Sequence, residues 1–163
     1  MRLIGAMMAV LLLAACGFTP LYGSSGTRPQ VQTALNDIYV EIIPDREGQY
    51  LRNRLIDRFH TAGTPQSPRY RLSLTPLSEQ RTDLDITKTA NTTRSQLRLS
   101  TKLSLRDAAS GEVLLHRDLS ATASFNILSS QFTTRVSEEN ARLNALDDLA
   151  RQAEQQIVLF LKR

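Results

Sequence analysis

Four basic residues recur at every fourth position near the middle of the chain. Arg94, Arg98, Lys102 and Arg106 share one parity, so in an unbroken strand their side chains would leave the same face. At about 3.4 Å per residue, neighbouring members would lie about 13–14 Å apart. Such a row of cations could bind phosphates or carboxylates along an extended anionic surface. The alternative is an open strand face that its cations keep solvated and free of aggregation.

The single cysteine, Cys16, offers a different chemistry. In an exported protein a lone cysteine has no intrachain disulfide partner. The order Leu13-Ala14-Ala15-Cys16 matches the bacterial lipobox, whose cysteine receives a thioether-linked diacylglycerol and, after cleavage, an acyl group on its amine. Each buried methylene contributes about 0.8 kcal/mol, so several acyl chains together hold a protein on a bilayer. The motif predicts that Cys16 is lipidated; a free structural cysteine is the alternative.

The residues before Cys16 have the pattern of an export signal. Arg2 supplies a positive end, residues 3–13 an apolar core, and two alanines the small residues of a cleavage site. A buried N-terminal helix is the alternative, but this run has no polar face and is followed by Gly and Pro. We therefore expect residues 1–15 to be a removed lipoprotein signal peptide. Gly17, rather than Asp, follows the cysteine, which in the lipoprotein sorting rule points to the outer membrane.

The composition argues against several classes of function. The formal net charge of the 163 residues is +4, and it falls to 4 − 1 = +3 without Arg2. This excess is spread along the chain, whereas nucleic-acid-binding proteins concentrate theirs in a patch. His60 and His116 have no Cys, Asp or Glu at metal-ligand spacing, and neither a phosphate-binding glycine loop nor a nucleophile elbow is present. We expect no nucleic acid partner, no metal, no cofactor and no enzymatic activity.

The hydrophobic pattern predicts the elements that would position these residues. Residues 16–34 are expected to be the lipidated N-terminus and a flexible tether, and residues 35–163 a single domain. The segments that are rich in β-branched residues or alternate apolar with polar residues are predicted strands, and they are residues 38–43, 69–75, 97–106 and 113–125. The segments with helical periodicity are residues 47–61 and the chain from the expected N-cap Ser137 to its end.

The order of these elements predicts the architecture. Pro76 indicates a bulge or break, after which the strand pattern resumes weakly at Leu84 and Ile86. The last two strands are joined by turn residues at 107–111 and should pair as a long antiparallel hairpin. The resulting β-α-β-β-β-α order predicts an α+β two-layer sandwich. Its largely antiparallel four-stranded sheet would carry two helices packed on one face.

Residues 16–23, Cys-Gly-Phe-Thr-Pro-Leu-Tyr-Gly, resemble the start of the mature chain in the LptE family of lipopolysaccharide-assembly lipoproteins, as found in α-proteobacteria. The resemblance implies a non-enzymatic, lipid-anchored outer-membrane protein. It would sit as a plug inside the β-barrel LptD in a 1:1 complex and assist assembly of that barrel. It would bind lipopolysaccharide on its way to the outer leaflet, with its body facing the periplasm and the barrel lumen.

Two alternatives to this function stay open. An accessory lipoprotein of a lipid-transport ABC system also joins an N-terminal lipid anchor to a small α/β domain, and a structural envelope lipoprotein would have no ligand. No motif of the family identifies glycolipid-binding residues in this sequence. The prediction that the basic row of residues 94–106 binds an anionic ligand therefore rests on the shared parity of these residues alone. The alternating Ser, Thr and Arg faces fit a plug, because the lumen of such a barrel is polar.

Overall fold

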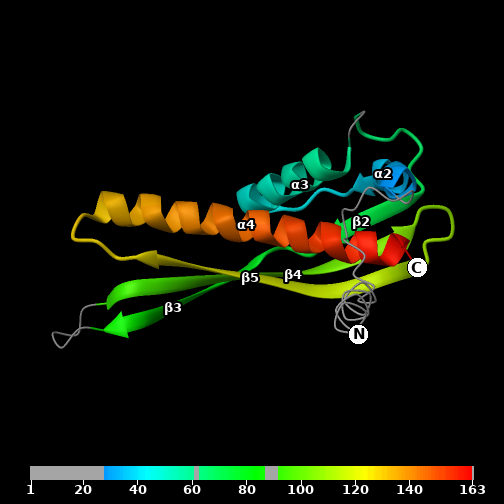
Figure 1. Ribbon diagram of the computed structural model, residues 1–163. Helices are drawn as coiled ribbons and strands as arrows, with labels where there is room; N and C mark the ends of the chain where they lie inside the picture. Colours follow the sequence, from blue (N-terminus) through cyan, green and yellow to red (C-terminus); the bar gives the residue numbers. More distant parts are fainter. Residues whose placement is uncertain (1–27, 61–62, 87–91, 163) are drawn as a thin grey trace, which may run out of the picture. The chain divides into compact units, whose positions relative to one another are not determined.

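The computed structural model describes residues 28–60, 63–86 and 92–162 (Figure 1). These ranges contain three helices and five strands, which are α2 (Arg28–Asn36), β1 (Ile38–Val40), α3 (Asp45–Phe59), β2 (Tyr70–Leu74), β3 (Ser78–Ile86), β4 (Thr92–Asp107), β5 (Val113–Asn126) and α4 (Gln131–Leu161). The predicted signal peptide, Cys16 and most of the predicted tether lie outside the described residues. Residues 31–163, which hold the whole sheet, form one unit separate from residues 1–30.

The strands form one mixed sheet around β4. β4 pairs antiparallel with β2 through residues 103–107 and with β3 through residues 92–100, while β5 pairs with residues 94–106. The β4 residues that pair with β5 include residues that also pair with β2 and residues that also pair with β3. β5 must therefore lie on the other edge of β4 from these two strands. β2 and β3 therefore follow each other along the opposite edge. β1 adds a parallel pair at β2.

The predicted α+β class is confirmed, but the predicted number of elements is wrong. Instead of four strands and two helices, the described residues hold five strands, one pair of them parallel, and three helices. The additional strand is β3: the second predicted strand ends as β2 at Leu74, and the segment after the break at Pro76, where the pattern resumed only weakly, forms a strand of its own. The additional helix is α2, whose first residues fall in the predicted tether.

α2 is held by tertiary contacts rather than by a strong helical pattern of its own. Leu35 is buried, and the side-chain amide of Gln32 donates a hydrogen bond to the carbonyl of Phe59, 3.0 Å away at the end of α3. Short helices are marginal without such packing. The sequence pattern around residue 30 therefore gave little signal for this helix.

The connection between β2 and β3 shifts the register of the sheet by one residue. Leu74 pairs with Leu103, and the next pair is Ser78 with Ser100. The chain therefore advances four residues from β2 to β3 while β4 advances only three. An odd shift moves every following side chain to the other face. Pro76 lies in this connection, as the predicted bulge or break required.

The shift changes which residues of this edge face the helices: even-numbered residues do so in β2, and Glu79 and Arg81 do so in β3. In β2 the residues Tyr70, Leu72 and Leu74 are buried on the inner face. In β3 the residues opposite the buried leucines of β4 are Glu79 and Arg81 instead. Leu84, one of the two residues at which the strand pattern was predicted to resume weakly, is 46% exposed. The inner face of β3 is thus charged.

The predicted hairpin of β4 and β5 is confirmed. Figure 1 shows α4 lying along one face of the hairpin and α3 beside α4 on the same side of the sheet. The apolar residues that face these helices are buried, and they include Leu97, Leu99, Leu103 and Leu105 of β4 and Leu115, Leu119, Ala121 and Phe125 of β5. The hairpin turn is held by the Asp107 carboxylate, which accepts from the backbone N–H groups of Ala109 and Ser110, and Gly111 adopts a φ of 73°.

α4 begins six residues before its expected N-cap. The helix starts at Gln131, so Ser137 lies within it. The Thr134 hydroxyl accepts a hydrogen bond from the backbone N–H of Leu128 at 2.9 Å and lies 3.1 Å from the carbonyl of Ser130. These bonds hold the first turn without a side-chain cap. The other predicted helix, 47–61, is shifted by two residues, to Asp45–Phe59.

Gly48 allows a close approach between α3 and the segment before it. A Cβ atom at this position would lie 2.7 Å from Cγ2 of Ile43 and 3.0 Å from its carbonyl oxygen, and Ile43 is fully buried. We expect Gly48→Ala to lower the free energy of unfolding by about 1–3 kcal/mol, although alanine is the better helix former. Urea denaturation followed by circular dichroism measures this. The control is Asn53→Ala on the exposed side of α3; a gain of stability in both variants would contradict the expected clash.

Candidate functional site

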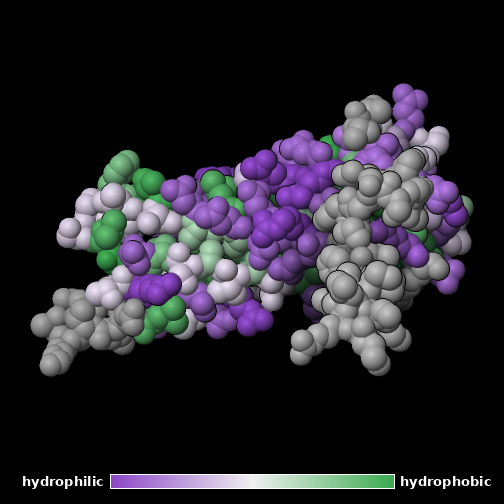
Figure 2. Space-filling view, in the orientation of Figure 1, coloured by the Kyte–Doolittle hydropathy of each residue, from purple (hydrophilic) through white to green (hydrophobic). Residues whose placement is uncertain are grey.

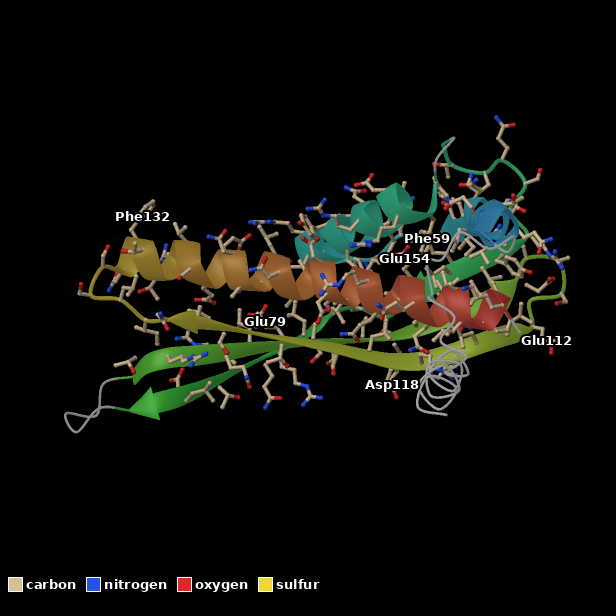
Figure 3. The ribbon with its side chains drawn as sticks, viewed as in Figure 1. Phe59, Glu79, Glu112, Asp118, Phe132 and Glu154 are labelled. Atoms are coloured by element: carbon tan, nitrogen blue, oxygen red, sulfur yellow. The ribbon has the colours of Figure 1, made fainter. Side chains whose placement is uncertain are left out.

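The face of the sheet that the helices leave uncovered carries the basic row. Arg94, Arg98, Lys102 and Arg106 are all exposed, and the residues between Arg94 and Arg106 with the other parity are buried. The structure therefore places all four on one side of β4, the side that we call the outer face. Their neighbours on β5 are Asn126, Thr122 and Asp118 opposite the first three. Figure 3 shows Asp118 pointing away from α4, on this outer face.

The cations of the outer face differ from those on the helix side in their partners. On the helix side, arginines pair with carboxylates across elements, as Arg58 does with Glu154 at 2.8 Å and Arg54 with Asp147 at 2.9 Å. Within the described residues, none of the four cations of the row forms an ion pair. Arg98 has one long contact, 3.4 Å to the hydroxyl of Ser120. The outer face thus presents four cations that form no ion pair within the described residues, although the carboxylate of Asp118 lies on the same face opposite Lys102.

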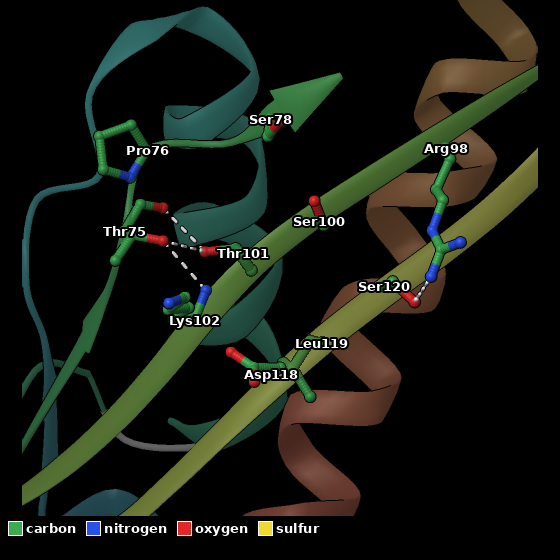
Figure 4. A pocket seen from close by; sticks show the side chains of 10 residues that line it. All are labelled: Thr75, Pro76, Ser78, Arg98, Ser100, Thr101, Lys102, Asp118, Leu119 and Ser120. Carbon is green, nitrogen blue, oxygen red and sulfur yellow. Dashed lines mark hydrogen bonds between the residues drawn. The ribbon is translucent and has the colours of Figure 1, made fainter. Parts of the chain in front are cut away.

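The break between β2 and β3 opens a first hollow on the outer face (Figure 4). Its volume is about 380 Å³, and Arg98 and Lys102 both line it. The other polar lining residues carry hydroxyls, apart from one carboxylate, and they are Thr75, Ser78, Ser100, Thr101, Ser120 and Asp118. Hydroxyls and cations around an open depression suit a polar, anionic ligand better than an apolar one.

The edge of this hollow is fixed by the residues at the break. The Thr101 hydroxyl donates to the carbonyl of Thr75 at 2.8 Å, and the backbone N–H of Lys102 donates to the Thr75 hydroxyl at 3.0 Å. Figure 4 shows these bonds beside Pro76. The backbone N–H of Thr75 also donates to the carbonyl of Lys102, at 3.1 Å. These bonds tie the broken edge to β4, so that the hollow has a defined wall.

A second hollow lies next to the first and shares Thr75 and Lys102 with it. Its volume is about 330 Å³. Lys102, Arg106 and His116 line it together with hydroxyl residues, and none of its lining residues is acidic. The structure therefore brings Arg98, Lys102 and Arg106 to two adjoining hollows, while Arg94 lies farther along β4.

Arg94 belongs instead to the end of the sheet where α4 begins. It lines a third hollow, together with Asn126 of β5 and Asn140 of α4. Beside this end stand three exposed apolar residues, Leu128, Phe132 and Val136, of which Phe132 is 77% exposed. Figure 2 shows hydrophobic residues gathered there, and Figure 3 shows Phe132 pointing outward from the start of α4. We call these three residues the apolar end.

The apolar end was not predicted from the sequence, because the expected helix start at Ser137 lies after these residues. Phe132 and Val136 are four positions apart, which is a helical spacing. This spacing is the feature of the sequence from which an earlier helix start could have been predicted. An exposed aromatic residue next to aliphatic ones commonly marks a surface that another molecule covers.

A network of ion pairs occupies the opposite, inner face of β3. Arg142 of α4 donates two parallel hydrogen bonds to the Glu79 carboxylate, at 2.9 and 3.0 Å, and further bonds to Glu139 at 2.7 Å and Glu138 at 3.2 Å. Figure 3 shows Glu79 on the side of the sheet that faces α4. The Arg142 guanidinium holds the pKa of Glu79 below its ordinary value of 4.5, and the carboxylates raise the pKa of Arg142. These charges are mutually satisfied, so the network serves the fold.

Two features are absent from the described residues. No helix there combines the length and the apolar character that crossing a membrane requires. Likewise, in residues 28–60, 63–86 and 92–162 no group of His, Cys, Asp and Glu side chains could hold a metal ion.

Comparison with protein families connects this architecture to a known group. Residues 35–161 match the model of the LptE family, which is described as lipopolysaccharide-assembly. The chain belongs to the LptE family. The resemblance read from residues 16–23 is thereby confirmed by an independent and longer part of the chain. LptE membership implies the role of a lipoprotein in lipopolysaccharide assembly, and the family is non-enzymatic.

Solved structures share the fold of this LptE-family chain. A putative lipoprotein from Caulobacter crescentus superposes with a TM-score of 0.64 at 18% identity, covering 83% of this chain and 98% of its own. The rare lipoprotein B from Shewanella oneidensis gives 0.54 at 12% identity, with coverages of 72% and 89%. A minor lipoprotein from Acinetobacter baumannii gives 0.54 at 21% identity, with coverages of 75% and 88%. No curated protein matches the chain significantly.

Proposed function

We propose that this LptE-family chain is an outer-membrane lipoprotein, anchored through Cys16, that plugs the LptD β-barrel and binds lipopolysaccharide during its transfer to the outer leaflet. The observation that carries the proposal is the unpaired basic row on the outer face, residues Arg94, Arg98, Lys102 and Arg106. Lipopolysaccharide is an anionic glycolipid, so a surface that receives it needs uncompensated cations.

The two hollows support binding of the sugar part of such a ligand. Their walls combine the cations Arg98, Lys102 and Arg106 with several hydroxyls. Charge-assisted hydrogen bonds to phosphates are about twice as strong as neutral ones, and hydroxyls can donate to or accept from sugar hydroxyls. The apolar end, in which Phe132 is largely exposed, adds a surface suited to the hydrocarbon part of an amphiphile.

The polar outer face also supports a position inside a barrel. Between the cations of β4, the residues of this face are Gln96, Ser100 and Ser104, and the outward residues of β5 include Ser120, Thr122 and Ser124. The lumen of an outer-membrane barrel is polar, so a sheet face of this composition can lie against it without burying unpaired apolar surface. The lipid anchor would keep the body at the membrane where the barrel is assembled.

Copurification tests the partner. An affinity-tagged form of the full chain, extracted from outer membranes in mild detergent, is expected to bring down a β-barrel of lipopolysaccharide transport in stoichiometric amount. Recovery of an inner-membrane permease instead would favour the accessory lipoprotein of a lipid-transport ABC system. Recovery of the chain alone would refute the plug and leave an envelope lipoprotein without a partner.

Charge reversal tests the ligand surface. We expect the double variant Arg98→Glu, Lys102→Glu to weaken lipopolysaccharide binding at least tenfold, because each lost charge-assisted contact is worth about 1.5–3 kcal/mol. The matched control, Arg151→Glu on the solvent side of α4, should bind as the parent does. Binding to immobilised lipopolysaccharide at fixed ionic strength measures both variants. An equal loss in the control would show that only net charge matters.

A further inference from the structure

The second hollow has the composition of an anion site. Its charged lining residues are Lys102 and Arg106 of β4, with the titratable His116 of β5 across from them. Ser73 and Ser104 contribute hydroxyls to the same wall. The first hollow contains the carboxylate of Asp118, whereas the second contains none. Of the two adjoining hollows, the second is therefore the one without an acidic lining residue.

A further cation, Arg71 of β2, lies beside Arg106 without lining the hollow itself. Arg71 and Arg106 lie directly opposite each other in the antiparallel pair of β2 and β4. Like charges in that position destabilise a sheet, because the two Cβ atoms are about 4.5–5.5 Å apart. Neither arginine forms an ion pair within the described residues; the Arg71 guanidinium lies 5.6 Å from the ring centroid of Tyr39. An anion beside the two strands would relieve their repulsion.

The size of the hollow limits what it can receive. At about 330 Å³ it is at the lower end of the range of small-molecule sites, about 300–1,000 Å³. This volume suits one sugar ring with its substituent and is too small for a whole glycolipid. Leu74 and Val113 are the apolar residues of the lining, and apolar atoms can contact the face of a sugar ring.

We propose that the second hollow is a subsite for a single sugar phosphate, whose phosphate monoester is bound by Arg106 and Lys102 and neighboured by Arg71. Ser73 and Ser104 lie where they meet the sugar hydroxyls. The inference rests on the proposed function, which it makes specific: of the whole basic row, this end receives a phosphorylated sugar unit. The same chemistry could come from a glycolipid or from free phosphate, and the experiment separates the two.

The test uses the isotope-labelled full chain in mild detergent and follows its backbone amide signals by NMR. The probes are glucosamine 1-phosphate, glucosamine and inorganic phosphate, at constant ionic strength. We expect saturable shifts around residues 73–75, 102–106 and 113–116 with glucosamine 1-phosphate, weaker ones with phosphate, and none with glucosamine. Equal affinity for phosphate and the sugar phosphate would overturn the sugar subsite. Shifts scattered over the molecule, without saturation, would overturn the site itself.

Substitutions test which residues bind the sugar phosphate. Arg106→Gln is expected to raise the dissociation constant for glucosamine 1-phosphate at least tenfold, whereas Arg106→Lys, which keeps the charge, should restore most of the affinity. Arg151→Gln on α4 removes the same charge far from the hollow and should have no effect. If Arg106→Gln lowers the melting temperature, Lys102→Gln provides the second test. Unchanged binding in both hollow variants, or equal weakening in Arg151→Gln, would refute the assignment.

Failure of this inference can be told from failure of the proposed function. Each variant is also carried through the barrel copurification. Intact copurification with no sugar phosphate binding in the parent chain would refute the subsite and leave the plug standing. Saturable binding at residues 102–106 without any barrel partner would support the subsite and refute the plug.

Discussion

Replacement of Cys16 by serine is expected to release the chain from the membrane. The serine hydroxyl cannot form the thioether to diacylglycerol, and the acyl chains contribute about 0.8 kcal/mol for each buried methylene. Losing several chains removes tens of methylenes, so partition into the membrane should fall by many orders of magnitude. Fractionation of cells expressing the chain in excess over the barrel measures this, since a bound barrel would also retain the body at the membrane.

The matched control for this experiment is Ser24→Ala, which changes one hydroxyl in the predicted tether and keeps the lipobox. Metabolic labelling with palmitate should mark the parent chain and Ser24→Ala, and leave Cys16→Ser unlabelled. A Cys16→Ser chain that stays in the membrane fraction after carbonate washing would refute the assignment of Cys16 as the anchor.

Arg142→Met is expected to be the most destabilising change outside the apolar core. The Arg142 side chain is 16% exposed and binds three carboxylates, Glu79, Glu138 and Glu139. Removing it leaves these like charges facing one another between β3 and α4. Breaking a buried ion pair in this way costs about 3–5 kcal/mol, and we expect about 3 kcal/mol here because the carboxylates remain partly hydrated. Arg151→Met, which removes a single exposed pair with Asp148, should cost less than about 1 kcal/mol.

The same network makes a prediction about pH. The pKa of Glu79 is lowered in the folded state, chiefly by its hydrogen bonds with Arg142. A carboxyl of this kind stabilises the fold above its unfolded pKa, and the contribution is lost as the pH falls through the folded value. The difference in unfolding free energy between the parent and Arg142→Met should therefore shrink below about pH 4.5. Urea denaturation at pH 7 and pH 3.5 checks this; a constant difference would show that Arg142 acts by packing alone.

The sheet and its basic row could be predicted from the sequence because both depend on local parity. Leu97 to Leu105 and Arg94 to Arg106 alternate within one strand, and an unbroken strand sends alternate side chains to opposite faces whatever its neighbours are. The hollows could not be predicted in this way. They depend on where β2 and β5 lie against β4, and on the break between β2 and β3, which are properties of several strands together.

The misplaced start of α4 has a related cause. Glu138 and Glu139 after Ser137 have the composition of a helix N-terminus, where carboxylates favour the dipole. In the structure these two carboxylates lie within the helix and bind Arg142. Residues of an ion-pair network therefore have the same sequence pattern as the first turn of a helix. Three charged residues of β3 at alternate positions, Glu79, Arg81 and Asp83, were the part of this network visible in the sequence.

The length of the connection between β2 and β3 determines which side chains of β3 face α4. Because Thr75, Pro76 and Leu77 add one residue relative to β4, a chain one residue shorter there would turn Glu79 and Arg81 to the outer face. It would also turn Ser78 and Gln80 toward α4, leaving Arg142 without its bidentate partner. The number of residues between the two strands is thus under a tighter constraint than the identity of any one of them. In a family whose members share little sequence identity, insertions and deletions should be rarer at this connection than its exposed position suggests.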